Sequence, residues 1–158
     1  MGENGTKQAT ITRAGTIGLS VTHLDGDAFE VEVRGHHLRV DQPVAAGGAD
    51  LGPSPVELFA ASLAACVGLY AQRSLRRHGL QADGLRVRCE ATMSSEPPTR
   101  VAAITVWLAG LPALTERQRD ALLAVVDHCT VHNSLRQTPV VRIELARGRR
   151  LSQALGAR

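Results

Sequence analysis

Aromatic residues are scarce in this chain of 158 residues, and long apolar runs are missing. Phe, Trp and Tyr together make up 3% of the sequence, which leaves little surface on which nucleic-acid bases could stack. No segment approaches the roughly 18 consecutive apolar residues that a membrane span needs. The first seven residues also lack the apolar core of a secretory signal. We therefore expect a cytoplasmic protein that binds neither nucleic acid nor a membrane.

Cysteine is also rare, and its number is odd: the chain contains Cys66, Cys89 and Cys129. An odd number of thiols fits a reducing compartment better than a framework of structural disulfides. The spacing of the three cysteines matches no zinc motif. Among the histidines, His128 and His132 alone are spaced like two ligands on one helical face. We expect neither a metal ion nor a cofactor.

The charge is nearly balanced, because 18 basic residues face 15 acidic ones and the net charge is +3. Several of the surplus arginines lie near the C-terminus, which indicates a basic tail rather than a nucleic-acid surface. Hydrophobic residues make up 44% of the chain, enough for one compact core at this length. We predict a disordered lead over residues 1–9, a single domain over 10–146 and a basic tail over 147–158.

Short β-strands are predicted in the first third of the chain. One apolar run extends from Ile17 to Val21, a second covers residues 29–33, and a third covers residues 37–41. The segment Asp25-Gly26-Asp27 is a turn signal, and Gly35 separates the last two runs. Short alternating strands with tight turns predict an antiparallel sheet.

A long helix is predicted after a loop over residues 43–55 that is rich in Gly and Pro. Ser54 is placed to cap this helix, with Pro55 at its first position and Glu57 in its first turn. The helix should end near Arg77, before Gly79. Apolar residues surround almost its whole circumference, so it should be buried on nearly every side.

The second half of the chain predicts two strands, a second helix and a final strand. The strands cover residues 85–92 and 100–108, the helix starts at Thr115 and runs toward Cys129, and the last strand covers 140–145. Cys89 alternates with apolar residues on its strand and is expected to be a core residue. Strands, a helix, strands, a helix and a strand indicate the α+β class.

Segments before and around the other two cysteines carry a specific similarity. They are Asp41-Gln-Pro43, Gly47-Gly48, Gly52-Pro-Ser-Pro-Val-Glu-Leu58, Ala60-Ala-Ser-Leu-Ala-Ala-Cys66 and Cys129-Thr-Val-His-Asn-Ser-Leu135. With them, residues 29–145 resemble the OsmC/Ohr family of osmotically inducible and organic-hydroperoxide-resistance proteins. The resemblance implies an OsmC-like fold, in which antiparallel sheets wrap around a central buried helix in an intertwined homodimer. The apolar character of the helix also favours a dimer, because a second subunit would cover apolar surface that one chain leaves exposed.

The resemblance also implies a thiol-dependent peroxidase that acts in the oxidative stress response. Cys66 matches the cysteine that reduces an organic hydroperoxide to an alcohol and becomes a sulfenic acid. Cys129 matches the cysteine that resolves the sulfenic acid as a disulfide, which a dithiol reductant such as a lipoyl protein then reopens. The apolar residues around Cys66 favour an organic hydroperoxide over hydrogen peroxide.

The activating groups of the family match less well. Its most active peroxidases place a glutamate where this chain has Val56, whereas Glu57 lies one residue later, as in a branch of OsmC-like proteins. The glycine-arginine motif of the hydroperoxide-resistance branch is absent, since the comparable turn reads Leu24-Asp25-Gly26. Arg39, just before the loop, is the candidate for the arginine that stabilises the thiolate.

Other cations compete with Arg39 for this role. Arg34 and Arg13 are alternative arginines, and a histidine near Cys66 would serve as well. The candidate histidines are His36, His37, His128 and His132. The departures from the family pattern leave a second interpretation open, a non-catalytic OsmC-like protein that binds a small apolar or thiol-reactive ligand at the dimer interface.

Overall fold

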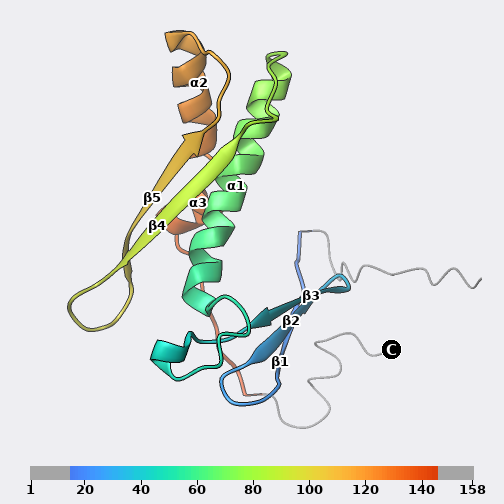
Figure 1. The fold of residues 1–158 in the computed structure, drawn as a ribbon, viewed down its shortest axis with the longest axis vertical. Helices are drawn as coiled ribbons and strands as arrows, with labels where there is room; N and C mark the ends of the chain where they lie inside the picture. Colours follow the sequence, from blue (N-terminus) through green and yellow to red (C-terminus); the bar gives the residue numbers. More distant parts are fainter. Residues whose placement is uncertain (1–14, 146–158) are drawn as a thin grey trace, which may run out of the picture. The chain divides into compact units, whose positions relative to one another are not determined.

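The computed structural model describes residues 15–145, which fall into two compact units (Figure 1). The first unit contains the described residues up to Pro55 together with those from Arg142, and the second covers Val56–Val141. The predicted lead and basic tail lie outside the described residues. Antiparallel sheets and a central helix confirm the α+β class and the OsmC-like fold.

The first unit contains the antiparallel sheet predicted from the early alternation. Its strands are β1 (Ser20–His23), β2 (Phe29–Val33) and β3 (His36–Val40), in the order β1-β2-β3. The β2–β3 turn consists of Arg34 and Gly35, both with positive φ, at 52° and 75°. A two-residue turn of this kind matches the right-handed twist of the flanking strands. A short 3-10 helix, η1 (Val44–Ala46), lies in the loop that follows β3.

One face of this sheet is apolar and largely uncovered in the single chain. The register aligns Val21 with Val31, and Val31 with Leu38, so the three side chains lie in a row across the strands. Val21 is 54% exposed and Leu38 is 42% exposed. A three-stranded sheet with an apolar face needs another element packed on it for stability.

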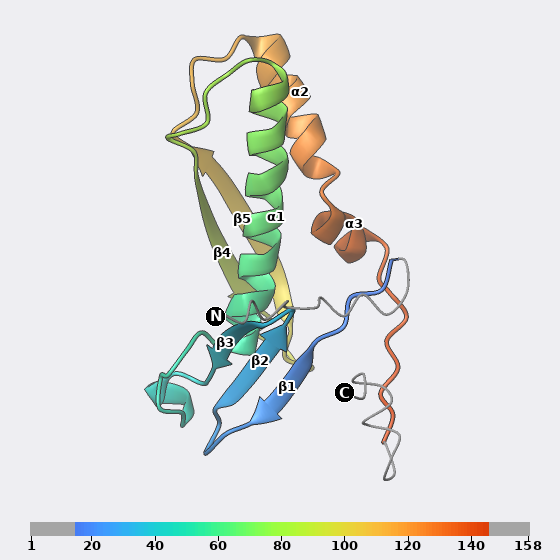
Figure 2. The same ribbon diagram turned by 90° about the vertical axis from the view of Figure 1, so that its right-hand side faces the viewer.

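The second unit is built around α1 (Pro55–Arg77), whose two ends agree with the prediction. Strands β4 (Arg86–Met93) and β5 (Val101–Ala109) form an antiparallel hairpin, and α2 (Glu116–Asp127) and α3 (Thr130–Arg136) follow. Thr115 caps α2 as predicted, in a reciprocal capping box with Gln118. Helix α1 lies between the hairpin and the two later helices (Figure 2).

The core of the second unit joins α1 to α2 and to the hairpin. Its buried members are Leu63, Val67, Ala71, Leu122, Val126 and Cys129. Ile104, Val106 and Leu108 of β5 pack against this cluster. Gly68 lets the helix approach the hairpin closely, because a Cβ there would lie 3.0 Å from the Val87 side chain.

Only one stripe of α1 is buried in the single chain. The buried residues recur at helical spacing, whereas Val56, Phe59 and Leu69 are each about two-fifths exposed. By length and composition alone, α1 could cross a membrane, with a mean hydropathy of 1.3 over 18 residues. Its packing makes it the core helix of a soluble OsmC-like fold. The apolar residues outside the stripe are available to a further partner.

Two predicted elements differ in the structure. The second helix does not run into Cys129: it ends at Asp127, and the extended backbone of Cys129 (φ −65°, ψ 150°) opens the separate helix α3. Residues 140–145 do not form a strand, because no strand in residues 15–145 pairs with them. A strand requires a neighbouring edge to satisfy its backbone N–H and C=O groups.

Candidate active site

The structure brings the two motif cysteines together. Cys66 lies in the middle of α1 and is half-buried, and Cys129 lies at the corner between α2 and α3 with none of its surface exposed. The Cys66 side chain lies close enough to the Cys129 thiol to raise the pKa of that thiol. Two thiols from elements far apart in the sequence therefore face each other at the edge of the apolar core.

The Cys129 thiol is held in its protonated form at neutral pH. Burial raises its pKa above the ordinary value of 9.0, because the apolar core disfavours a charged thiolate. The backbone amides of His132 and Val131, in the first turn of α3, act in the opposite direction, and the contact with Cys66 raises the pKa further. Cys129 therefore faces Cys66 as a neutral thiol.

Side-chain bonds fix the corner that carries Cys129. Tyr70 of α1 and Thr130 of α3 are hydrogen-bonded through their hydroxyl oxygens, 3.0 Å apart. Arg136 donates to both carboxylate oxygens of Asp127, at 2.9 and 2.8 Å, and His132 Nδ1 lies 3.5 Å from the same carboxylate. The first contact connects the corner to α1, and the others connect α3 to the end of α2.

Cys89 stands apart from this pair. Its thiol donates to the carbonyl oxygen of Ala60 in α1, at a sulfur-oxygen distance of 3.7 Å, and its side chain is half-buried on β4. Burial, and then the negative charge of Glu90, raises the pKa of the Cys89 thiol. The contact shows that Cys89 faces α1, but Cys89 is only half-buried and is not among the residues that pack in the core cluster.

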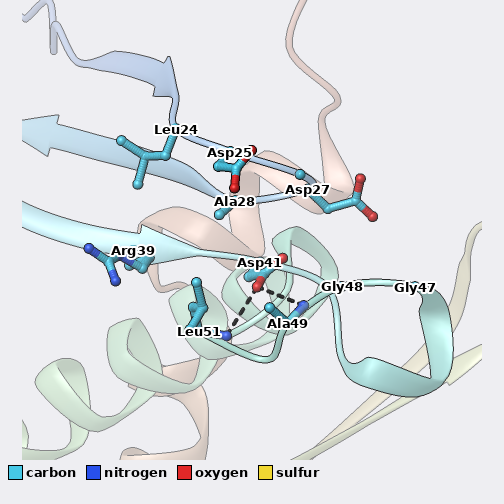
Figure 3. Close-up of a pocket in the computed structure, with 11 residues that line it drawn as sticks. Leu24, Asp25, Asp27, Ala28, Arg39, Asp41, Gly47, Gly48, Ala49 and Leu51 are labelled. Carbon is cyan, nitrogen blue, oxygen red and sulfur yellow. Dashed lines mark hydrogen bonds between the residues drawn. The ribbon is translucent and has the colours of Figure 1, made fainter.

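A buried carboxylate, the first residue of the Asp41-Gln-Pro43 motif, organises the loop before α1, a role that was not predicted from the sequence. Asp41 is 1% exposed and accepts hydrogen bonds from the amides of Gln42, Ala49 and Leu51 at 2.7, 3.1 and 3.1 Å (Figure 3). The loop closes so tightly that a Cβ on Gly48 would lie 2.1 Å from the Gln42 carbonyl oxygen. The Leu51 amide contributes most to lowering the pKa of Asp41, against the effect of burial.

Replacing Asp41 with asparagine is expected to lower the melting temperature by several degrees at pH 7, because the amide cannot accept all three N–H bonds. The carboxylate's pKa lies below 3.8 in the folded protein, so its stabilisation is complete above that pH and is lost as the pH falls through the folded pKa. Thermal unfolding from pH 7 to pH 2 should show the two proteins converging in acid. Asp27→Asn, in the same pocket but exposed, is the control; an equal loss there would contradict the prediction.

Comparison with known proteins decides the family. A sequence profile of the family described as OsmC-like protein matches residues 47–144, well over half of the chain. The chain belongs to the OsmC-like protein family. Proteins of the wider OsmC/Ohr family are typically homodimers. No curated protein matches the chain.

Solved structures share the OsmC-like fold. An osmotic stress induced and detoxification response protein from Psychrobacter arcticus superposes with a TM-score of 0.70 at 20% identity, covering 76% of this chain and 88% of that one. An OsmC-like protein from Mycoplasma pneumoniae gives 0.67 at 15% identity, covering 80% and 91%. The organic hydroperoxide resistance protein OhrB of Bacillus subtilis gives 0.57 at 17% identity, covering 80% and 94%.

In this OsmC-like chain, Glu57 does not face Cys66. The two residues are nine positions apart on α1, and at about 100° per residue they lie on opposite sides of the helix, roughly 13 Å apart along its axis. Glu57 is exposed in the first turn of the helix. Glu57 would therefore act by orienting the activating cation and not by contacting the Cys66 thiol. That role stays a prediction.

Arg39 lies on β3 in the first unit of the OsmC-like chain. Its side chain is exposed and lines a pocket of about 410 Å³ with Leu24, Leu51, Asp25 and Asp27 (Figure 3). Cys66 and Cys129 belong to the second unit. The pairing of Arg39 with the Cys66 thiolate therefore stays a prediction.

Two of the alternative cations, His37 and His128, have other partners in the structure. Arg34 is a turn residue with positive φ, and Arg13 lies outside the described residues. His37 Nδ1 lies 3.3 Å from a Glu30 carboxylate oxygen, and His128 Nδ1 lies 2.8 Å from the Ala124 carbonyl oxygen. Across residues 15–145, no three His, Cys, Asp or Glu side chains are grouped so that they could hold a metal ion.

Proposed function

We propose that this OsmC-like protein is a thiol-dependent peroxidase that reduces organic hydroperoxides to alcohols, as part of an oxidative stress response. One observation carries the proposal: the side chains of Cys66 and Cys129 lie next to each other at the edge of an apolar core. Two neighbouring thiols from different elements are placed as a nucleophile and its resolving partner. The similar fold of an organic hydroperoxide resistance protein supports this assignment.

The proposed reaction has two steps. The Cys66 thiolate attacks the distal oxygen of the hydroperoxide, so an S–O bond forms, the O–O bond breaks, and the departing alkoxide takes a proton to become the alcohol. Cys129 then attacks the Cys66 sulfenic acid. The S–S bond forms, the S–O bond breaks, and the hydroxide leaves as water with the proton of Cys129. A dithiol reductant, such as a lipoyl protein, returns both thiols by exchange.

The surroundings of the thiols support an apolar substrate. Leu63 and Val67 of α1 and Leu122 and Val126 of α2 form the core on which Cys129 packs, and Cys66 borders the same cluster. Apolar walls favour the hydrocarbon part of an organic hydroperoxide over the small and polar hydrogen peroxide. In this proposal, Arg39 stabilises the thiolate and Glu57 orients that arginine.

We further propose that the active form is a cytoplasmic homodimer with interlocked sheets. The apolar face of the β1-β2-β3 sheet and the exposed apolar residues of α1 and of 140–145 give each chain surface that needs a cover. The three cysteines are free thiols, which suits a reducing compartment. Light scattering of the 16.8 kDa chain measures the assembly, and a monomer at micromolar concentration would contradict it.

The second candidate function is non-catalytic binding of a small apolar or thiol-reactive ligand at the same site. Two observations favour it: Val56 stands where active relatives have a glutamate, and Glu57 lies on the far side of α1 from Cys66. A binding protein needs an apolar surface beside the thiol but not the activating carboxylate. The rate of Cys66 oxidation distinguishes the two functions.

The reduced protein should form the Cys66–Cys129 disulfide when it is mixed with cumene hydroperoxide. We expect Cys66 to react at least about a hundred-fold faster than free cysteine, and more slowly with hydrogen peroxide, because the site is apolar. Mass spectrometry should show the loss of two hydrogens in the wild type. Cys129→Ser should instead gain one oxygen, as a trapped sulfenic acid. A thiol that reacts no faster than free cysteine would favour the binding function.

A further inference from the structure

Tyr70 and Thr130 each lie beside one of the two cysteines. Tyr70 follows Cys66 by four positions on α1, so the two side chains share a helix face, and Thr130 directly follows Cys129. The two hydroxyl oxygens are 3.0 Å apart and hydrogen-bonded. The aromatic ring of Tyr70 also packs against the core cluster that contains Cys129. This hydrogen bond therefore connects the two cysteine-bearing elements next to the sulfurs.

Apolar packing with Leu63 and Val67 places Cys129 against α1, but such packing is not directional. Cys129 has extended backbone at the break between α2 and a helix of seven residues. The Asp127–Arg136 ion pair connects that short helix to α2 but not to α1. A disulfide forms only when the two Cα atoms lie about 4.4–6.8 Å apart with suitable Cβ directions. Small movements of this corner would take Cys129 out of that range.

The contact between the two sulfurs cannot hold the corner through a reaction cycle. It joins the Cys129 thiol to the Cys66 sulfur, and it changes as soon as Cys66 carries an oxygen. The Tyr70–Thr130 bond involves no sulfur, so it persists when Cys66 is oxidised. The Tyr70–Thr130 hydrogen bond can therefore hold the corner while Cys129 approaches the Cys66 sulfenic acid.

We propose that Tyr70 and Thr130 are positioning residues that hold Cys129 at disulfide-forming distance from Cys66. The positioning role during turnover rests on the proposed peroxidase function, in which Cys129 attacks the Cys66 sulfenic acid and water leaves. Without the bond, the sulfenic acid survives longer. A second hydroperoxide molecule can then add another oxygen to Cys66, with cleavage of its O–O bond and release of a second alcohol, to give a sulfinic acid that Cys129 cannot resolve.

Two variants remove only the hydroxyl groups, Tyr70→Phe and Thr130→Val. Each should slow disulfide formation after the sulfenic acid has formed by roughly three- to ten-fold, the factor that a single hydrogen bond supplies. The rate of sulfenic acid formation should not change, and the fraction of Cys66 that becomes sulfinic acid should rise with hydroperoxide concentration. The double variant should be no slower than either single variant, because both remove the same bond.

Matched controls separate positioning from general destabilisation. Thr130→Ser keeps the hydroxyl and should restore the wild-type partition between disulfide and sulfinic acid. Ser134→Ala removes a different α3 hydroxyl, which donates to the Thr130 carbonyl oxygen at 3.0 Å within the helix, and should leave the partition unchanged. If Ser134→Ala acts as strongly as Thr130→Val, the effect comes from the stability of α3 and the proposal is wrong.

A second measurement needs no hydroperoxide. Equilibrating each protein in a glutathione or dithiothreitol redox buffer gives the stability of the Cys66–Cys129 disulfide directly. Tyr70→Phe and Thr130→Val should each weaken it by roughly three- to ten-fold relative to wild type. If the variants weaken the disulfide but the wild-type protein does not react with hydroperoxide, the peroxidase function is overturned and the positioning role is supported. Unchanged equilibria in both variants would overturn the positioning role whatever the enzymatic result.

Discussion

Replacing Cys66 with serine is expected to abolish hydroperoxide reduction. A serine hydroxyl does not ionise at neutral pH and is a poor nucleophile toward peroxide oxygen, so the rate should fall by more than about a thousand-fold. The side chain is half-buried, and the two residues are similar in size, so the fold should persist. Consumption of cumene hydroperoxide in the presence of a dithiol reductant measures the rate, and circular dichroism checks the fold.

Cys89→Ser is the matched control for Cys66→Ser. Cys89 is also half-buried in the second unit, but its thiol donates to the Ala60 carbonyl oxygen and is not part of the reactive pair. Its replacement should retain activity within about two- to three-fold, since only one weak hydrogen bond changes. Equal losses in both variants would show that Cys66 acts through packing, and activity retained in Cys66→Ser would exclude the proposed mechanism.

Replacing Ile143 with aspartate is expected to dissociate the proposed homodimer. In the single chain, Ile143 is 92% exposed, and a surface substitution of that kind would change stability by no more than about 0.5 kcal/mol. If residues 140–145 pair with a sheet of the partner, Ile143 becomes buried and the substitution removes about 2–3 kcal/mol of apolar burial in each chain. The dimer contains two copies, so the dissociation constant should rise by a factor on the order of 10³ to 10⁴. Sedimentation across a dilution series measures it.

Glu144→Lys is the control at the neighbouring position. Val141, Ile143 and Leu145 alternate with Arg142 and Glu144, so a strand at this position would direct the apolar set to one face and the charged set to the other. Glu144→Lys should therefore leave the dimer nearly unchanged. Equal effects at both positions would exclude strand pairing, and a dimer unaffected by Ile143→Asp would place the interface elsewhere.

The elements with strong local signals could be predicted closely from the sequence. Pro55 and Gly79 mark the ends of α1, because proline is suited to a first helical turn and the glycine adopts the positive φ of 68° that ends a helix. Thr115 with Gln118 marks the start of α2 by a side-chain cap. In each case, the physical cause acts over a few neighbouring residues, so the sequence contains it in full.

The corner at Cys129 could not be predicted in the same way. The apolar spacing of α2 continues toward it, but the backbone extends at Cys129, and the bonds that hold the new helix reach Tyr70 on α1 and Asp127 at the end of α2. The role of Asp41 could not be predicted for a similar reason. An acidic residue after a strand usually lies at the surface. Asp41 is buried because three backbone amides of a loop that folds back over it donate hydrogen bonds to its carboxylate.

The sequence by itself determined the family, the class of fold and the identity of the two motif cysteines, because motifs, caps and periodicity depend on residues close together in the chain. Only the tertiary structure decided that Cys66 meets Cys129 and that the Cys129 thiol is wholly buried with a raised pKa. These features depend on which side of α1 turns toward α2 and α3. Long-range packing of apolar surface makes that choice, and it cannot be read from neighbouring residues.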